Sequence, residues 1–138
     1  MPTARHQSGV ALKNSAPIFL ARVVGNDGSA LVQANLSSIA YSIYRLDPND
    51  PDSETAVSGH SAVSLTVANV VFDTLQLGVL WQNDDGEFVD DTGYNFKFQP
   101  SIASNQAFAV AGADYLVRVT MTPGSGQKII VAWKVKCI

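Results

Sequence analysis

The last 24 residues constrain the fold of this chain most strongly. Residues 115–122 and 129–138 are both rich in β-branched and aromatic residues, and a Pro-Gly-Ser-Gly segment at 123–126 separates them. Two such runs around a proline-glycine turn predict a β-hairpin. In the second run, Trp133 and Cys137 alternate in phase with other apolar residues, so we expect both side chains in the core.

Short runs of β-branched and aromatic residues recur along the chain, with turn signals about every ten residues and no helical periodicity over three turns. Ile39, Tyr41 and Ile43 alternate on one strand face, and Tyr94, Phe96 and Phe98 do so on another. The pattern predicts an all-β fold, a single antiparallel β-sandwich of about seven or eight short strands. The expected strands before the hairpin are 17–25, 38–46, 62–67, an element from 70, and 94–98.

Two segments between these runs lack a strand pattern. Residues 47–54 hold two prolines and four acids, so we expect an exposed loop there and no strand. Residues 73–78 are expected to form a turn or a single helical turn. Residues 79–81 are expected to be a short extended piece.

The length of 138 residues favours one domain, with residues 1–16 as an N-terminal arm and residues 17–138 as the sandwich. The arm is polar and built of small residues, and such a segment often becomes ordered only by lying on a neighbouring subunit. We therefore expect contacts with a neighbour from Arg5, His6, Val10, Leu12 and Lys13.

The net charge of −3 argues against a nucleic-acid binder, and no apolar run is long enough to span a membrane. The charge is unevenly distributed, because residues 46–96 contain ten of the twelve acids and no Lys or Arg. One end of the domain could then be acidic and another basic, so that copies meet head to tail or the acidic end docks on a basic partner. Solvated acidic loops explain the same pattern.

Residues suited to catalysis are few. The two histidines, His6 and His60, lie in the arm and in a loop, where we expect them to be solvated, and there is no Gly-x-Ser-x-Gly motif. Cys137 is the single cysteine, so a disulfide within the chain and a Cys/His zinc site are both excluded. No phosphate-binding loop is present. We expect no catalytic residue, no cofactor and no enzymatic activity.

Two weaker possibilities remain for binding. Carboxylates could supply oxygen ligands to calcium, although their spacing does not match an EF-hand loop. The candidates are Asp84, Asp85, Glu87, Asp90 and Asp91, and also Asp47, Asp50 and Asp52. Trp81 could be exposed for carbohydrate recognition, or it could be a buried aromatic between two sheets.

From Gly93 onward the chain resembles immunoglobulin-like proteins encoded by tailed bacteriophages and prophages. The resemblance covers roughly residues 17–136. A similar arrangement occurs in the N-terminal domain of siphophage baseplate upper proteins. The residues that carry it are Gly93-Tyr-Asn-Phe, Pro100, Ala111-Gly-Ala-Asp-Tyr-Leu-Val-Arg-Val and Thr122-Pro-Gly-Ser-Gly, with Ile18–Val23, Asn26-Asp-Gly and Ile39–Tyr44 in the same layout. It implies an immunoglobulin-like sandwich in which the Tyr115 hydroxyl holds backbone near a sheet corner. It implies no catalytic residues.

The resemblance also implies a virion structural protein, assembled in the host cytoplasm. We expect a capsid-associated decoration or cement protein that binds the major capsid protein or other virion proteins, and its own copies, through the arm and strand edges. The nearest alternative is a tail, neck or baseplate component. An alternative of another class is a carbohydrate- or host-surface-binding module.

Overall fold

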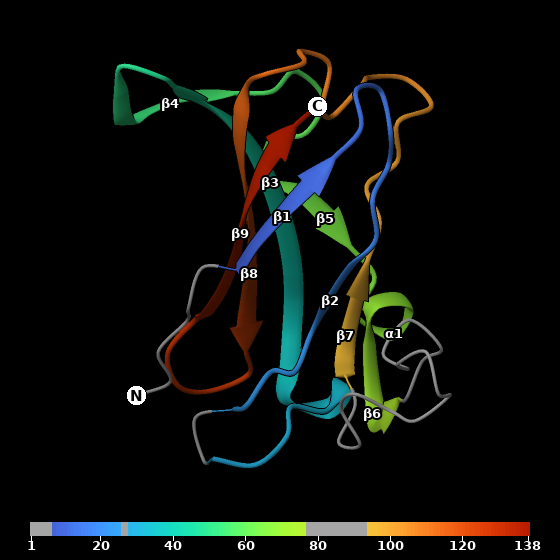
Figure 1. Ribbon diagram of the computed structural model, residues 1–138. Helices are drawn as coiled ribbons and strands as arrows, with labels where there is room; N and C mark the ends of the chain where they lie inside the picture. The colour runs from blue at the N-terminus through green and yellow to red at the C-terminus, as the bar shows by residue number, and fades with distance from the viewer. Residues whose placement is uncertain (1–6, 26–27, 77–93) are drawn as a thin grey trace, which may run out of the picture.

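Two β-sheets packed face to face form the part of the chain that the structure describes, residues 7–25, 28–76 and 94–138 (Figure 1). In this computed structural model the predicted all-β sandwich is confirmed. Helical geometry within these ranges is limited to a 3-10 turn, η1 (Gln33–Asn35), and a four-residue helix, α1 (Val67–Val70).

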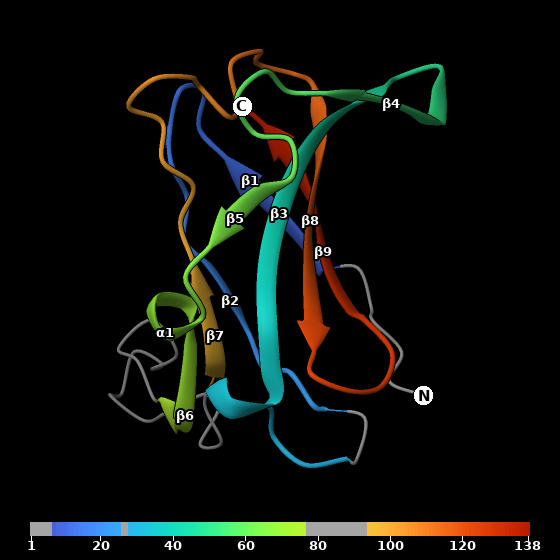
Figure 2. The same cartoon turned by 180° about the vertical axis from the view of Figure 1, so that it is seen from behind.

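The larger sheet has the order β1-β9-β8-β3-β4, and β5 also pairs with β3 (Figure 2). The smaller sheet has the order β2-β7-β6. The pairing is antiparallel throughout the described strands except between β1 and β9, which run parallel. The strands are β1 (Gln7–Ala11), β2 (Phe19–Ala21), β3 (Leu36–Asp47), β4 (Asp50–Ala56), β5 (Val63–Leu65), β6 (Val71–Gln76), β7 (Tyr94–Phe98), β8 (Asp114–Pro123) and β9 (Ile129–Cys137).

The predicted C-terminal hairpin is confirmed as β8 and β9, which pair in an unbroken register from Asp114↔Lys136 to Met121↔Ile129. Trp133 is 5% exposed and Cys137 is fully buried, as the alternation along this strand predicts.

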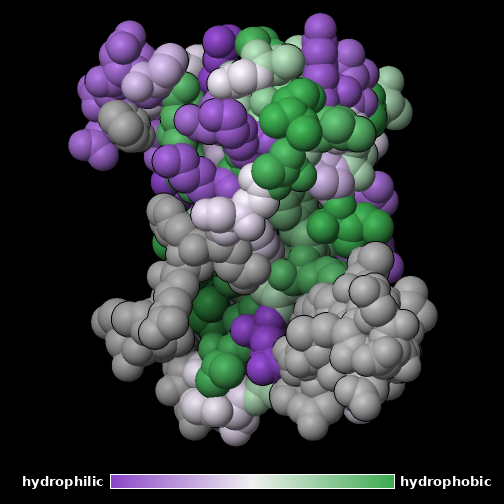
Figure 3. Space-filling view, viewed as in Figure 1, coloured by the Kyte–Doolittle hydropathy of each residue, from purple (hydrophilic) through white to green (hydrophobic). Residues whose placement is uncertain are grey.

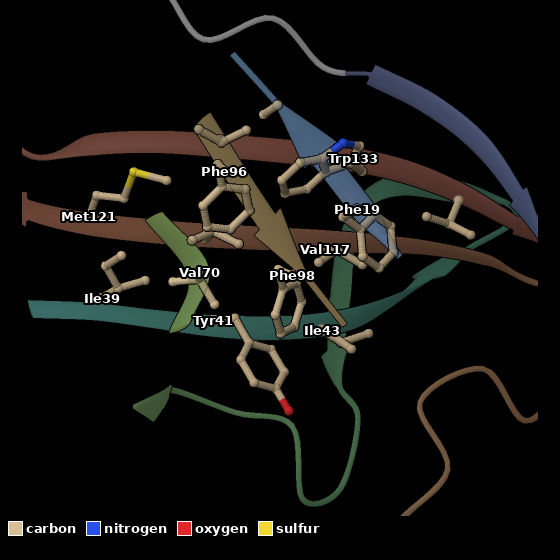
Figure 4. Packing of buried hydrophobic residues seen from close by; sticks show 14 of the residues in the cluster. Phe19, Ile39, Tyr41, Ile43, Val70, Phe96, Phe98, Val117, Met121 and Trp133 are labelled. Carbon is tan, nitrogen blue, oxygen red and sulfur yellow. The ribbon is translucent and has the colours of Figure 1, made fainter. Parts of the chain in front are cut away.

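Aromatic rings fill the space between the sheets (Figure 4). The Phe98 ring lies 4.6 Å from the Tyr41 ring and 5.9 Å from the Phe19 ring, measured between centroids. Phe96 stacks on Trp133 at 5.9 Å, which joins β7 to β9. The rings therefore connect both sheets across the sandwich, and aromatic pairs at such separations add to the stability that apolar burial provides.

Two expectations about loops were wrong. The prolines and acids of residues 47–54 predicted a loop, but residues 50–56 form β4, which pairs with β3. A proline is tolerated there because β4 is an edge strand, whose outer side needs no N–H donor. The segment from Asp73 to Gln76 belongs to β6, and the helical turn comes earlier, at α1. Residues 79–81 lie outside the described ranges.

The N-terminal segment also differs from the expectation of a separate arm. Within residues 1–16, positions 7–11 form β1 and pair with β9 of the same chain. The regular backbone hydrogen bonds that β9 offers order this segment, although its own sequence carries no strand pattern.

A buried amide joins the start of the chain to the smaller sheet. Asn95 of β7 is 2% exposed, and its Oδ1 accepts a hydrogen bond from the Val23 N–H at 2.7 Å. Its Nδ2 donates to the carbonyl oxygens of Val23 at 2.9 Å and Leu31 at 3.0 Å. One side chain thus satisfies the Val23 N–H and the Leu31 carbonyl, and it adds a second donor to the Val23 carbonyl, which also accepts from the Leu31 N–H at 3.0 Å.

Candidate functional site

The edge strand β1 brings together three of the residues expected to contact a neighbour. Val10 and Leu12 have exposed fractions of 63% and 64%, and Lys13 is exposed. The parallel ladder continues past the end of β1, because Ile138 N–H donates to the Ala11 carbonyl and Lys13 N–H donates to the Ile138 carbonyl, both at 2.8 Å. This register places Leu12 directly opposite Ile138, which is 56% exposed.

We call Val10, Leu12 and Ile138 the edge patch. Their neighbours along the chain, Ala11 and Cys137, point into the core, so alternation turns the patch toward the outer face of the larger sheet. Figure 3 shows hydrophobic residues gathered over the end of β1 and the C-terminus, with hydrophilic residues beside them. The sequence analysis missed Ile138, because its place depends on pairing with a segment at the other end of the chain.

The backbone of β1 also offers hydrogen bonds on its outer side. In a strand, the N–H and C=O of one residue point to the same side, and those of the next residue point to the other. Ala11 and Lys13 bond to β9, so the backbone groups of Ser8, Val10 and Leu12 face away from it. The Leu12 carbonyl accepts from Ser15, but no described strand pairs with this side of β1. β1 is therefore a free edge of the kind that accepts another strand.

The two edges of the larger sheet differ in their protection against such pairing. Charged side chains, prolines and irregular pairing are the usual means of blocking a sheet edge. β4 has all three, with Pro51, the carboxylates of Asp50 and Asp52, and a register shift after Leu46. β1 has none of them, since residues 7–12 are Gln-Ser-Gly-Val-Ala-Leu.

Basic residues surround the edge patch. Lys134 and Lys136 of β9 pair with Ser8 and Val10 of β1, and both lysines are exposed, as is Lys13. Among the described acids, Asp114 of β8 pairs with Lys136. Four others lie on the opposite edge of the sheet, where the β3–β4 hairpin projects from the body of the sandwich (Figure 1): Asp47, Asp50, Asp52 and Glu54. Glu54 of this hairpin forms an ion pair with Arg118 of the neighbouring strand β8, with 3.0 Å between the carboxylate and guanidinium atoms.

Several predicted site residues lie outside the described ranges. These are Arg5, His6 and Trp81, and the calcium candidates Asp84, Asp85, Glu87, Asp90 and Asp91. Two aromatic residues were expected on one face of the strand at 94–98. Tyr94 begins β7, and only its backbone is described, whereas Phe96 is buried in the core.

The other calcium candidates serve the turn between β3 and β4. Asp47 Oδ1 accepts from the Asn49 N–H at 2.9 Å, and Asp50 Oδ1 accepts from the Asp52 N–H at 3.2 Å. Aspartates commonly stabilise turns in this way. Across the described ranges, no three His, Cys, Asp or Glu side chains cluster so as to hold a metal ion.

Tyr115 stands at the start of β8 with its ring buried and its hydroxyl bonded to backbone. Its Oη accepts a hydrogen bond from the Val110 N–H at 3.1 Å, and its ring meets Phe108 edge-on at 5.2 Å. This is the contact that the resemblance to immunoglobulin-like proteins led us to expect of this hydroxyl. This hydrogen bond holds the backbone four residues before the start of β8, where the chain enters the hairpin.

The expectation that His60 is solvated was wrong, because the residue is 1% exposed. Its Nε2 lies 2.9 Å from the Asn105 carbonyl oxygen, which can only accept, so Nε2 carries a hydrogen. In the neutral ring Nδ1 then accepts from the Tyr41 hydroxyl at 2.8 Å. The adjacent Gly59 has a φ of +81°, and a Cβ there would collide with the Asn105 side chain. The histidine thus joins three segments of the fold and has no open access to a substrate.

Replacing Tyr41 with phenylalanine should weaken the fold and change its response to alkali. The change removes the partner of His60 Nδ1, so we expect a loss of about 1–3 kcal/mol in the free energy of unfolding at neutral pH. Burial raises the pKa of Tyr41 above its ordinary value of 10.0. Above pH 10, the unfolded chain therefore loses this proton while the folded chain keeps it, and wild-type stability falls by up to about 1.4 kcal/mol per pH unit.

Urea denaturation of wild type and Tyr41→Phe between pH 8 and pH 11 checks this expectation. The variant should lose less stability than the wild type above pH 10, since groups common to both proteins titrate alike. Equal losses in the two proteins would contradict the role assigned to Tyr41.

A half-open groove of about 370 Å³ lies at the other end of the sandwich, between the 25–35 segment and the β8–β9 turn. The groove is lined by residues that include Leu31, Asn35, Gly124 and Ile129, and its described lining includes no charged or aromatic side chain.

None of the helical segments in the described ranges is long and apolar enough to span a membrane.

Comparison with known proteins assigns the chain to no family: no family model, curated protein or solved structure matches it. No match links the chain to phage virion proteins. Any function must therefore be proposed from the sequence and from the site itself.

Proposed function

We propose that this protein is a non-enzymatic assembly protein that binds a protein partner by strand addition at the β1 edge. The observation that carries the proposal is the free outer side of β1, where unpaired backbone groups lie beside the exposed edge patch. An added strand would satisfy those groups, and burial of the patch would supply apolar stabilisation of about 25 cal/mol for each Å² removed from water.

We propose further that the sandwich is immunoglobulin-like. Support comes from the strand orders β9-β8-β3-β4 and β2-β7-β6, which follow the order of a variable-type immunoglobulin sandwich. The Tyr115 hydroxyl, bonded to backbone just upstream of β8, adds to this support. The pairing of β5 with β3 departs from that pattern.

The setting that we propose is the virion of a tailed phage, where the protein would act as a capsid decoration or cement protein. This setting is supported only by the sequence resemblance over residues 17–136. Quantitative mass spectrometry of purified particles, as copies relative to the major capsid protein, tests it. Near-equal copies support a decoration protein, a few dozen or fewer point to the tail, neck or baseplate, and complete absence overturns the virion setting.

A lysine placed on the β1 edge should block incorporation into particles. A charge on an edge strand opposes pairing with another strand, so we expect Val10→Lys to lower the number of copies per particle at least about tenfold, which corresponds to about 1.4 kcal/mol. Thr55→Lys is the matched control, because Thr55 is exposed on the opposite edge strand, β4. Equal incorporation of both variants would overturn the role of β1.

A further inference from the structure

We infer that the strand added at the β1 edge comes from a second copy of this chain, whose own β1 pairs antiparallel with the first about a two-fold axis at Val10. This inference names the partner of the edge and rests on the proposed function. It would join the two larger sheets into one continuous sheet.

The backbone of β1 fits this register. Val10 has both its N–H and its C=O on the free side, so Val10 of each copy can exchange two hydrogen bonds with its counterpart. The same register sets Ser8 opposite Leu12, where the free Leu12 N–H can donate to the Ser8 carbonyl. The Ser8 N–H faces the Leu12 carbonyl in this pair, and that carbonyl already accepts from Ser15, so each Ser8–Leu12 pair gains one new hydrogen bond.

The side chains also suit pairing with a copy. Val10 would face Val10 directly, and Leu12 of each copy would lie on the same outer face, opposite Ser8 of the other copy. Apolar pairs opposite each other in a sheet are mutually stabilising. The edge patches of the two copies would then form one apolar strip that neither copy can cover alone, since all three residues are more than half exposed.

Electrostatics permit this arrangement despite the surrounding lysines. Residues 7–12 carry no charge, and Lys13 would fall opposite position 7, a glutamine. Lys136 lies opposite Val10 on β9, so the two copies of Lys136 would be three strand spacings apart, about 14 Å. That distance exceeds the Debye length of about 8 Å at physiological salt, so their repulsion is largely screened.

The alternative pairing of β1 with the acidic β4 edge of another copy is favoured by charge and opposed by the backbone. Pro51 lacks an N–H, and the register of β4 shifts near the turn. The unprotected edge therefore fits a second unprotected edge better than it fits the protected one.

Cysteine cross-linking tests both the partner and the register. A two-fold axis at Val10 places the two Cα atoms at this position about 5.5 Å apart, within the range for a disulfide. Val10→Cys alone should therefore form disulfide dimers in the presence of oxidised glutathione. Ser8→Cys and Leu12→Cys should each form few such dimers alone, and should cross-link when mixed. Thr55→Cys is the exposed control, while the native Cys137 is fully buried.

Sedimentation velocity of the full chain provides the second measurement. We expect a dimer for the wild type and for Thr55→Lys, and a monomer for Val10→Lys with an unchanged circular dichroism spectrum. A monomeric wild type, or cross-linking of Val10→Cys no faster than that of Thr55→Cys, overturns self-pairing. If Val10→Lys then still loses incorporation into particles, the proposed function stands with a different partner. Dimerisation of the wild type together with normal incorporation of Val10→Lys supports self-pairing and overturns the proposed function.

Discussion

Replacing Phe98 with alanine lowers the free energy of unfolding by about 3–5 kcal/mol, which is a large part of the stability of a domain this size. Phe98 is 2% exposed, and its ring contacts the rings of Phe19, Tyr41 and Phe96. These partners come from β2, β3 and β7, so the cavity that alanine leaves would open between the two sheets. Rigid strands on both sides can close such a cavity only in part.

Urea denaturation of Phe98→Ala and Phe98→Leu measures this effect. Leucine retains most of the buried apolar volume, so its loss should be less than half that of alanine. Val110 is an exposed hydrophobic residue, and Val110→Ala should change stability by less than about 0.5 kcal/mol. A loss below about 1 kcal/mol for Phe98→Ala would contradict the central position of this ring.

Replacing Asn95 with alanine is expected to cost about 2–4 kcal/mol, because the buried Val23 N–H and Leu31 carbonyl lose the partner that this side chain provides. Asn95→Asp has nearly the same shape and keeps the acceptor for the Val23 N–H. Its second oxygen, however, would face two carbonyl oxygens, and the introduced charge would be buried.

The pH dependence of Asn95→Asp distinguishes lost hydrogen bonds from lost packing. Burial disfavours the charged form and so raises the pKa of the introduced carboxyl in the folded state. The resulting deficit relative to wild type should therefore be largest at pH 7 and shrink as the pH falls toward 4, where a protonated carboxyl can donate one hydrogen bond. Denaturation curves at pH 4 and pH 7 measure it, and a deficit that is independent of pH would contradict this account.

Strands that the sequence predicts well are those with one buried face. β3, β7, β8 and β9 each carry apolar residues at every second position, and this period of two is visible without any knowledge of their partners. The edge strands β1 and β4 have little or no buried face, so their sequences resemble loops. Their neighbours β9 and β3 impose the extended conformation, and the identity of those neighbours is a property of the tertiary fold.

The polar residues of the interior were predicted less well for the same reason. His60 and Asn95 are buried because segments far apart in sequence, around Asn105 and between Val23 and Leu31, supply their hydrogen-bond partners. Nothing near either residue in the sequence marks it as internal. Val10, Leu12 and Lys13 were named as candidate contacts from the N-terminal sequence alone, and the position of Ile138 beside Leu12 became apparent only from the parallel register of β1 and β9.

Because β1 pairs with β9, the edge patch can form only after β9 has been synthesised. During synthesis β1 is made before its partner β9, which follows more than a hundred residues later. Until residues 129–138 emerge, the nascent chain has no template that would hold Val10 and Leu12 in an extended edge, and Ile138 is still missing from the patch. A chain that lacks residues 129–138 therefore cannot display the complete edge patch, and the self-pairing proposed for β1 would have to follow the synthesis of β9.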